Sequence, residues 1–186
     1  AEAGTSRPVR WNTGGAVWTT TSKDFKSFLK SGDINDRALL EGINNSGWTA
    51  EEIQEGMTKT YAVDIIGVHR FLYSDDGVRF LKDQTRSYFP NWKMKSTSVV
   101  ALRSAIIADS IDGEISSAGI LAELPVDFRL ADTCGTHDGI QNFCAPNHCE
   151  GDAQCTSLLS WYVFLPACLQ ANSALPEPAP RVAPAR

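Results

Sequence analysis

The chain has 186 residues, of which 42% are hydrophobic and 21% are charged, and its formal net charge is −5. This length and composition predict one domain with a buried core, or one domain plus an extension. The acidic balance and the lack of a basic patch argue against nucleic-acid binding. No apolar run approaches the ~20 residues that a membrane-spanning helix needs, so we expect a protein that is at most peripheral to a membrane.

The N-terminal segment, residues 1–20, is predicted to hold a β-hairpin. Val9 and Trp11 alternate with polar residues, Gly14 and Gly15 follow, and the next stretch is rich in strand formers. A single hairpin is unstable alone, so we expect Trp11 and Trp18 to anchor it on the rest of the chain. The start Ala-Glu-Ala, without methionine, is typical of a processed N-terminus, although a shortened chain would begin in the same way.

Residues 21–125 are predicted to form a domain of about seven short helices. Capping signals mark several helix starts, and one of them, Thr49-Ala-Glu-Glu52, is a complete capping box. Short helices have little stability of their own, so packing must hold them together. The predicted N-terminal caps are Thr21, Thr49, Asp64, Ser74, and Ser116 or Ser117, and a further short helix is expected over Asp33–Asn44.

The stretch from Thr97 to Gly113 is predicted to be the central buried helix. Its apolar residues fall on two neighbouring stripes, which is typical of a helix buried on more than one side. Arg103 and Asp109 interrupt the apolar surface. The first stripe is Val99, Leu102 and Ile106, and the second is Val100, Ile107 and Ile111.

After Pro125 the composition changes, and we expect a cysteine-rich arm over residues 126–173. Val126–Leu130 is predicted to be extended and Leu158–Leu169 to be an apolar helix. The Pro/Ala-rich end, residues 174–186, is predicted to be an extended tail. In the apolar helix, the residues predicted to bind a partner are Trp161, Tyr162, Phe164 and Pro166; the alternative is that this helix folds back and completes the core.

The five cysteines are predicted to form disulfides, because the arm has little core of its own and needs covalent stabilisation. Spacing does not fix the pairing. The candidates for two intrachain bonds are Cys134, Cys144, Cys149 and Cys155. Cys168 is the candidate for a free or intermolecular thiol. The neighbouring His137 and His148 make a mixed metal site conceivable, but no CxxC zinc spacing is present, and we expect neither metal nor cofactor.

No catalytic motif can be identified. The chain has no G-x-S-x-G sequence, and no motif places a histidine beside a serine or cysteine. Asp109, Asp112 and Gly113 resemble part of a calcium-binding loop, but Gly119 occupies the position that requires an acidic residue. His69 lies among apolar residues and is expected to be a packed or surface histidine. The sequence therefore predicts a protein that is not an enzyme.

Several short motifs between about Val9 and Leu130 carry a family resemblance. They are Phe25–Gly32, Tyr61–Asp64, Arg70–Ser74 followed by Gly77, Ala101–Ala105 and Asp112–Ser116. This region resembles the small helical domain of a cyanobacterial family described as alpha/beta hydrolases of unknown function. The hydrolase domain and its nucleophile are absent here, so the activity does not carry over. The resemblance implies a photosynthetic lineage and an exported, periplasmic or lumenal setting.

These observations lead to three functional hypotheses. The first is an accessory subunit without catalytic activity in the thylakoid lumen of a plastid or cyanobacterium. It would bind a photosystem or light-harvesting antenna through the C-terminal arm. The second is a separate lumenal or periplasmic module that binds an apolar ligand between its short helices. The third is a divergent enzyme that acts through a cysteine thiolate.

Overall fold

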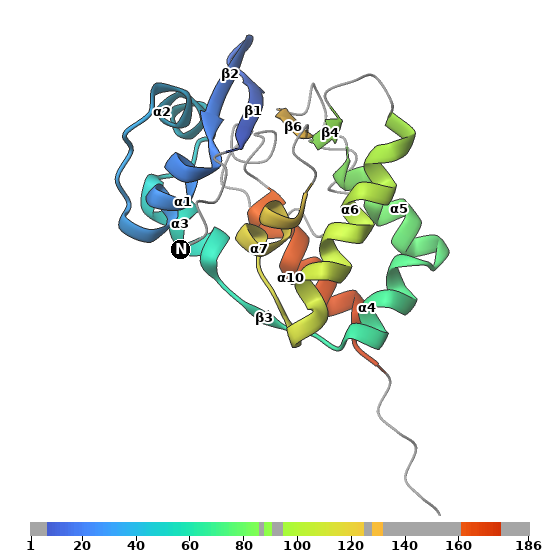
Figure 1. The fold of residues 1–186 in the computed structure, drawn as a ribbon. Helices are drawn as coiled ribbons and strands as arrows, with labels where there is room; N and C mark the ends of the chain where they lie inside the picture. The colour runs from blue at the N-terminus through green and yellow to red at the C-terminus, as the bar shows by residue number, and fades with distance from the viewer. Residues whose placement is uncertain (1–6, 86–87, 91–94, 125–127, 132–160, 176–186) are drawn as a thin grey trace, which may run out of the picture.

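The computed structural model describes residues 7–85, 88–90, 95–124, 128–131 and 161–175. Helices predominate in these ranges, and a small β-sheet lies across one end of them (Figure 1). The predicted mainly helical fold with an N-terminal strand pair is therefore confirmed. The predicted disulfide network at Cys134, Cys144, Cys149 and Cys155 lies outside the described residues.

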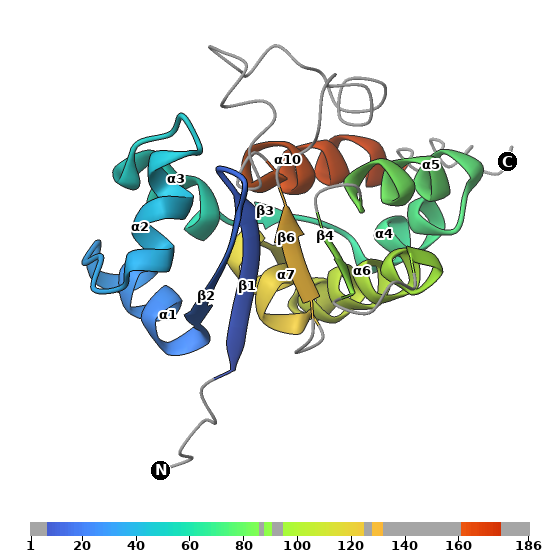
Figure 2. The same cartoon turned by 90° about the horizontal axis from the view of Figure 1, so that it is seen from above.

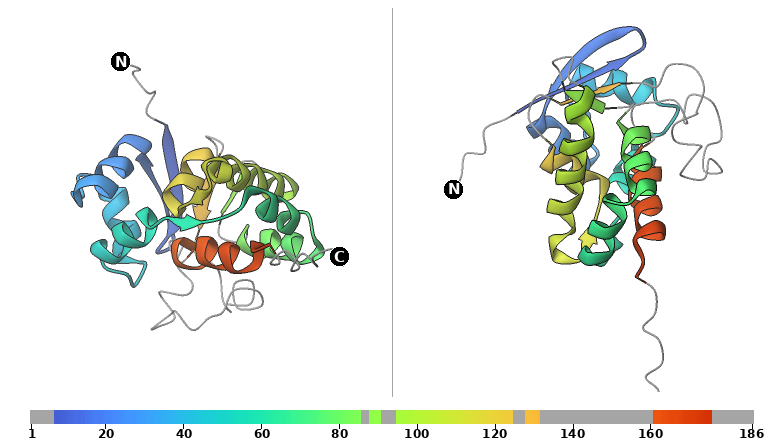
Figure 3. Two further views of the ribbon diagram at one scale, coloured as in Figure 1. Left: turned by 90° about the horizontal axis from the view of Figure 1, so that it is seen from below. Right: turned by 90° about the vertical axis from the view of Figure 1, so that its right-hand side faces the viewer.

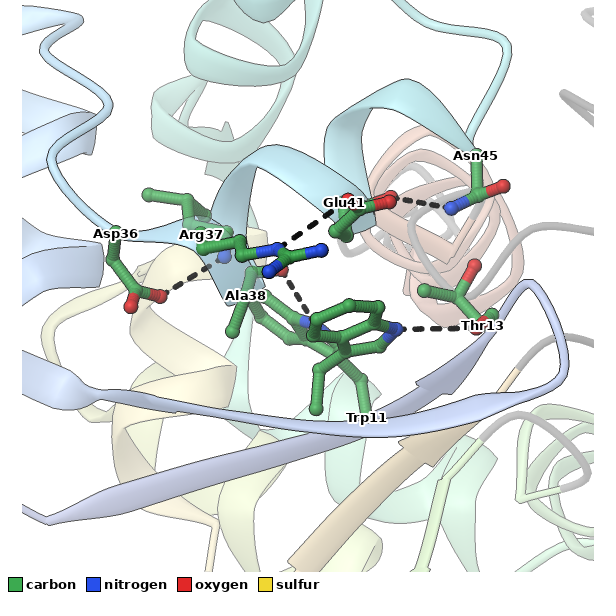
Figure 4. A network of polar contacts seen from close by, with 9 residues as sticks. Trp11, Thr13, Asp36, Arg37, Ala38, Glu41 and Asn45 are labelled. Atoms are coloured by element: carbon green, nitrogen blue, oxygen red, sulfur yellow. Dashed lines mark hydrogen bonds and ion pairs between the residues drawn. The ribbon is translucent and has the colours of Figure 1, made fainter.

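The N-terminal hairpin consists of β1, Pro8–Thr13, and β2, Ala16–Thr21, in a continuous antiparallel register. Gly14 and Gly15 have φ angles of 57° and 77°, as the tight turn of a two-residue hairpin requires. Trp11 is buried and donates its indole N–H to the carbonyl oxygen of Ala38 at 2.9 Å (Figure 4). This bond and the burial of the ring hold the hairpin on the helices, as expected for an anchor.

Two further strands extend the hairpin to a four-stranded sheet of order β2-β1-β6-β4. Strand β6, Phe128–Ala131, is parallel to β1, and β4, Tyr88–Pro90, is antiparallel to β6. The sequence predicts a loop over Phe89–Trp92, which overlaps this strand, because three residues are too few to show alternation. Pro90 is compatible with its position because β4 is an edge strand of the described sheet.

Seven α-helices fall within the described part of residues 21–125. Predicted caps at Thr21, Thr49, Asp64, Ser74 and Ser116 are confirmed, and the Thr49–Glu52 capping box is complete. Asp36 caps the helix predicted over Asp33–Asn44, so it begins later than expected. The helices are α1 (Ser22–Ser31), α2 (Arg37–Asn44), α3 (Ala50–Thr58), α4 (Ile65–Leu72), α5 (Asp75–Gln84), α6 (Lys95–Asp109) and α7 (Ser117–Glu123).

Short elements connect the two ends of the helical region. Strand β3, Tyr61–Ala62, pairs with β5, Glu114–Ile115, and the 3-10 helix η1, Ser110–Asp112, continues α6. Helices α1 to α3 lie on one side of the hairpin, and α4 to α6 lie on the other side (Figure 2). Helices α7 and α10 lie between these groups (Figure 3).

Helix α10, Trp161–Ser173, contacts α3, α4 and α7. Its Leu165 and Leu169 are fully buried members of the hydrophobic core. Because β6 also lies between β1 and β4, the described parts of residues 126–173 share one sheet and one core with the helices before Pro125. The boundary predicted at Pro125 does not separate two packing units in the described residues.

Candidate functional site

Helix α6 is buried on one side and exposed on the other. Leu102 and Ile106 of the first predicted stripe are fully buried. In the second stripe, Val100 is 58% exposed and Ile111, which follows in η1, is 70% exposed. Ile107, the middle residue of this stripe, is half-buried and packs against the core. The second predicted stripe is therefore buried only in its middle, and Val100 and Ile111 at its two ends are exposed.

Helix α4 presents a second exposed stripe. The Asp64 carboxylate accepts the backbone N–H groups of Ile66 and Gly67 and so fixes where the helix begins. The helical period then places Val68, Phe71 and Leu72 in the core. The opposite side of the helix carries the exposed residues Ile66, His69, Arg70 and Tyr73.

Side chains of α4 and α6 meet in a stacked row. The guanidinium carbon of Arg103 lies 4.4 Å from the centre of the Tyr73 ring, which is a cation–π geometry. The His69 ring centre lies 4.6 Å from that of Tyr73, with the planes tilted by 34°. The Arg103 Nε–H also donates to the carbonyl oxygen of Leu72 at 3.2 Å. This bond holds the guanidinium against the C-terminal end of α4.

These residues come from elements that lie side by side, because α4 contacts both α6 and η1 (Figure 1). We call them together the α4–α6 surface, which consists of Ile66, His69, Tyr73, Val100, Arg103 and Ile111. Ile66 and Tyr73 are 56% and 58% exposed. Aromatic side chains and arginine on an exposed apolar background are the composition that protein interfaces favour at their centres.

The charges on and around this surface are unevenly distributed. Within the described residues, neither Arg70 nor Arg103 takes part in an ion pair with a carboxylate. Among the described residues of α4, η1 and α5, exposed acidic residues flank this surface. Asp64 precedes α4, Asp112 ends η1, and Asp75 and Asp76 begin α5. The middle of the surface is therefore cationic and its ends are anionic.

The carboxyl group of Asp109 is perturbed by burial, and this residue has a structural role. Burial raises the pKa of its carboxyl group above the usual value, the hydrogen bond from Ser116 lowers it, and the nearby Asp112 and Glu123 raise it further. Its Oδ2 accepts the Ser116 N–H at 3.0 Å and joins the end of α6 to the start of α7. No group of three or more potential metal ligands occurs in the described ranges.

The structure corrects the prediction for Cys168. This residue is disulfide-bonded, so it is not the unpaired thiol, and its partner lies outside the described residues. The apolar sequence around Cys168 suggests a buried thiol, but the side chain is only partly buried at the border of the core. Its sulfur also accepts the Asn172 Nδ2–H at 3.6 Å.

The predicted partner-binding residues of α10 are not brought together on a described surface. Pro166 is buried, so its predicted contact with a partner is wrong. The apolar character of this helix serves the core through Leu165 and Leu169. The backbone of Trp161, Tyr162 and Phe164 belongs to α10, whereas their side chains lie outside the described residues.

Sequence reasoning missed the α4–α6 surface, although its signals were present. The second apolar stripe of α6 and the isolated His69 are both visible in the sequence. An apolar stripe on a helix predicts contact with something, but it does not tell a core from an interface. Only the packing of the helices shows that Ile107 lies against the core while Val100 stays exposed.

Comparison with known proteins identifies no relative: no family model, no curated protein and no solved structure matches this chain. The resemblance to the helical domain of a cyanobacterial family stays a prediction. None of the helices in the described ranges has the length and apolar character needed to cross a membrane.

Proposed function

We propose that the protein is an accessory subunit without catalytic activity and that it docks on a larger protein assembly through the α4–α6 surface. The observation that carries this proposal is the stacked row of His69, Tyr73 and Arg103 on an exposed apolar background. Tyrosine and arginine are enriched among the residues that dominate binding energy. Because the stack already restrains these side chains, less conformational entropy is lost on binding.

The proposed setting is the thylakoid lumen, with a subunit of a photosystem or its antenna as the partner. Two observations support this setting. The sequence resemblance implies a photosynthetic lineage, and Cys168 is disulfide-bonded. Disulfides persist in oxidising compartments and are rare where glutathione keeps thiols reduced.

The charge distribution favours a protein partner over a lipid surface. A carboxylate of the partner would complement Arg103 and Arg70, and its apolar side chains would cover Val100 and Tyr73. An anionic membrane surface would also meet the acidic ends of the α4–α6 surface, where like charges repel. We therefore expect a partner segment with apolar residues around one or more acidic side chains.

The test is a pull-down of photosystem and antenna subunits from solubilised thylakoid membranes with the tagged full chain. The double variant Tyr73→Ala/Arg103→Ala removes both stacked groups, whereas Leu40→Ala removes an exposed apolar side chain on α2 and serves as the control. Truncation of a central interface residue costs about 2 kcal/mol or more. We expect the affinity of the double variant for the partner to be lower than that of the wild type by about tenfold or more. The control should bind as much partner as the wild type.

Two results would count against the α4–α6 surface. One is full retention by the double variant. The other is that only the double variant Trp161→Ala/Phe164→Ala loses binding, which would show that the protein docks through the C-terminal arm. Thermal unfolding of every variant establishes that reduced binding does not come from reduced stability.

A further inference from the structure

Strand β2 is an edge strand of the described sheet, whose order is β2-β1-β6-β4 (Figures 1 and 2). It pairs with β1 over its whole length, from Thr13 opposite Ala16 to Pro8 opposite Thr21. Its other side has no paired strand within the described ranges. An edge of this kind is a ready template for a further strand.

The register shows which backbone groups of β2 face outward. Ser22 donates its backbone N–H to the carbonyl of Arg7, so these two residues form a hydrogen-bonded pair. Such pairs alternate along an antiparallel ladder, so Ala16, Trp18 and Thr20 direct their backbone groups towards β1. Val17 and Thr19 direct theirs towards the open edge. Among the described residues, no backbone hydrogen bond beyond the ladder involves either residue.

This edge lacks the features that usually prevent strand addition. The sequence of β2, AVWTTT, contains no charged residue and no proline. The register has no bulge, and Val17 is 56% exposed. By contrast, β4 at the opposite edge has three residues and contains Pro90. Lysine, proline and bulges are the usual protection of edge strands, and β2 has none of them.

We propose that β2 is a dimerisation strand that pairs antiparallel with β2 of a second copy of this chain. A two-fold axis at Trp18 places Val17 of each copy opposite Thr19 of the other. Both residues direct their backbone groups outward, so each such pair exchanges both of its N–H···O bonds. The two sheets would then become one continuous sheet. This inference does not depend on the proposed function.

A second copy is the occupant that fits this edge because the strand is self-complementary. The strand carries no charge, so two-fold pairing brings no like charges of β2 together. Val17 and Thr19 are β-branched residues, which suit cross-strand contacts. Trp18 would face Trp18 of the second copy at the non-hydrogen-bonded position, where side chains approach closely. Aromatic cross-strand pairs are among the stabilising ones.

The position of Trp18 prepares it for such a contact. Its indole N–H donates to the carbonyl of Thr13 at 3.3 Å, and the Arg37 guanidinium lies 5.6 Å from the ring centre. Arg37 also approaches Glu41 on the next turn of α2, at 3.9 Å (Figure 4). These contacts fix the ring before association, so little side-chain freedom remains to be lost.

The experiment measures the mass of the full chain by sedimentation equilibrium over a range of concentrations. Free thiols are alkylated during purification, and a non-reducing gel establishes that no disulfide joins two copies. We expect the mass to rise from 20.3 kDa to twice that value. Salt should strengthen the association, because it screens the repulsion between two chains of net charge −5.

Two variants of the edge test the assignment to β2. Thr19→Pro removes an outward N–H that takes no part in the ladder to β1, and Val17→Lys places a charge at the edge without altering the backbone. Both should stay monomeric at every concentration, with circular dichroism spectra like that of the wild type. Leu40→Lys, an exposed position on α2, should still dimerise. A wild type that stays at 20.3 kDa, or a Val17→Lys variant that dimerises like it, would overturn the proposal.

Discussion

At the scale of single residues, Asp109 links stability to pH. Burial raises the pKa of its carboxyl group in the folded state, so the folded chain holds this proton at a pH where the unfolded chain has lost it. Stability should therefore decrease as the pH rises from about 3.9, the usual pKa of aspartic acid, through the raised pKa. Above the raised pKa the carboxyl group is charged, and the unfavourable free energy of burying this charge continues to lower the stability of the folded state.

Asp109→Asn tests this dependence. The amide oxygen can still accept the Ser116 N–H, while the buried charge and its repulsion from Asp112 and Glu123 disappear. We expect the variant to be more stable than the wild type at neutral pH and to lose the acid-range slope. Urea unfolding across a pH series measures both effects, with Asp33→Asn, at an exposed aspartate between α1 and α2, as control. A less stable variant at neutral pH would show that the carboxylate charge is favourable at this site.

At the scale of elements, α6 offers a matched pair of positions on one helix. Ile106 is fully buried, whereas Val100 is exposed. Ile106→Ala should lower the free energy of unfolding by about 2–5 kcal/mol, because it leaves a cavity. Val100→Ala should change it by no more than about 0.5 kcal/mol. Equal urea midpoints for the two variants would contradict the orientation of α6.

Local signals explain why the helix starts were predictable and the exposure of Val100 was not. A capping residue acts on backbone groups within its own turn, so Thr49, Asp64 and Ser74 are recognisable without knowledge of the fold. The exposure of Val100 depends on where α4 packs, which involves residues about thirty positions away. The strand Tyr88–Pro90 likewise depends on β6 beside it.

At the scale of the whole molecule, a change in composition along the sequence does not mark a boundary in the packing. The change after Pro125 is real in the sequence, but it does not mark an independent arm in the described residues. Strand β6 needs β1 and β4 as neighbours, and Leu169 needs the helices around it. Long-range contacts of this kind leave no local signal, which is also why the pairing of Cys168 could not be predicted.

The last prediction concerns removal of the residues after Leu130. The sequence alone predicts a helical domain that folds without them, whereas the packing predicts that it unfolds. Loss of α10 exposes the core around two fully buried leucines, Leu165 and Leu169, each worth about 2–5 kcal/mol on truncation to alanine. Their sum is comparable to the whole stability of a domain, about 5–15 kcal/mol.

The truncated chain should therefore lose its cooperative thermal transition, as followed by circular dichroism. In the full chain, Leu169→Ala isolates the contribution of one α10 side chain and leaves the disulfide of Cys168 in place. We expect it to lower the free energy of unfolding by about 2–5 kcal/mol, against a negligible change for the exposed Leu40→Ala. A truncated chain that still unfolds cooperatively would show that the core is stable without α10. In that case α10 would be available to bind a partner, as the sequence predicts.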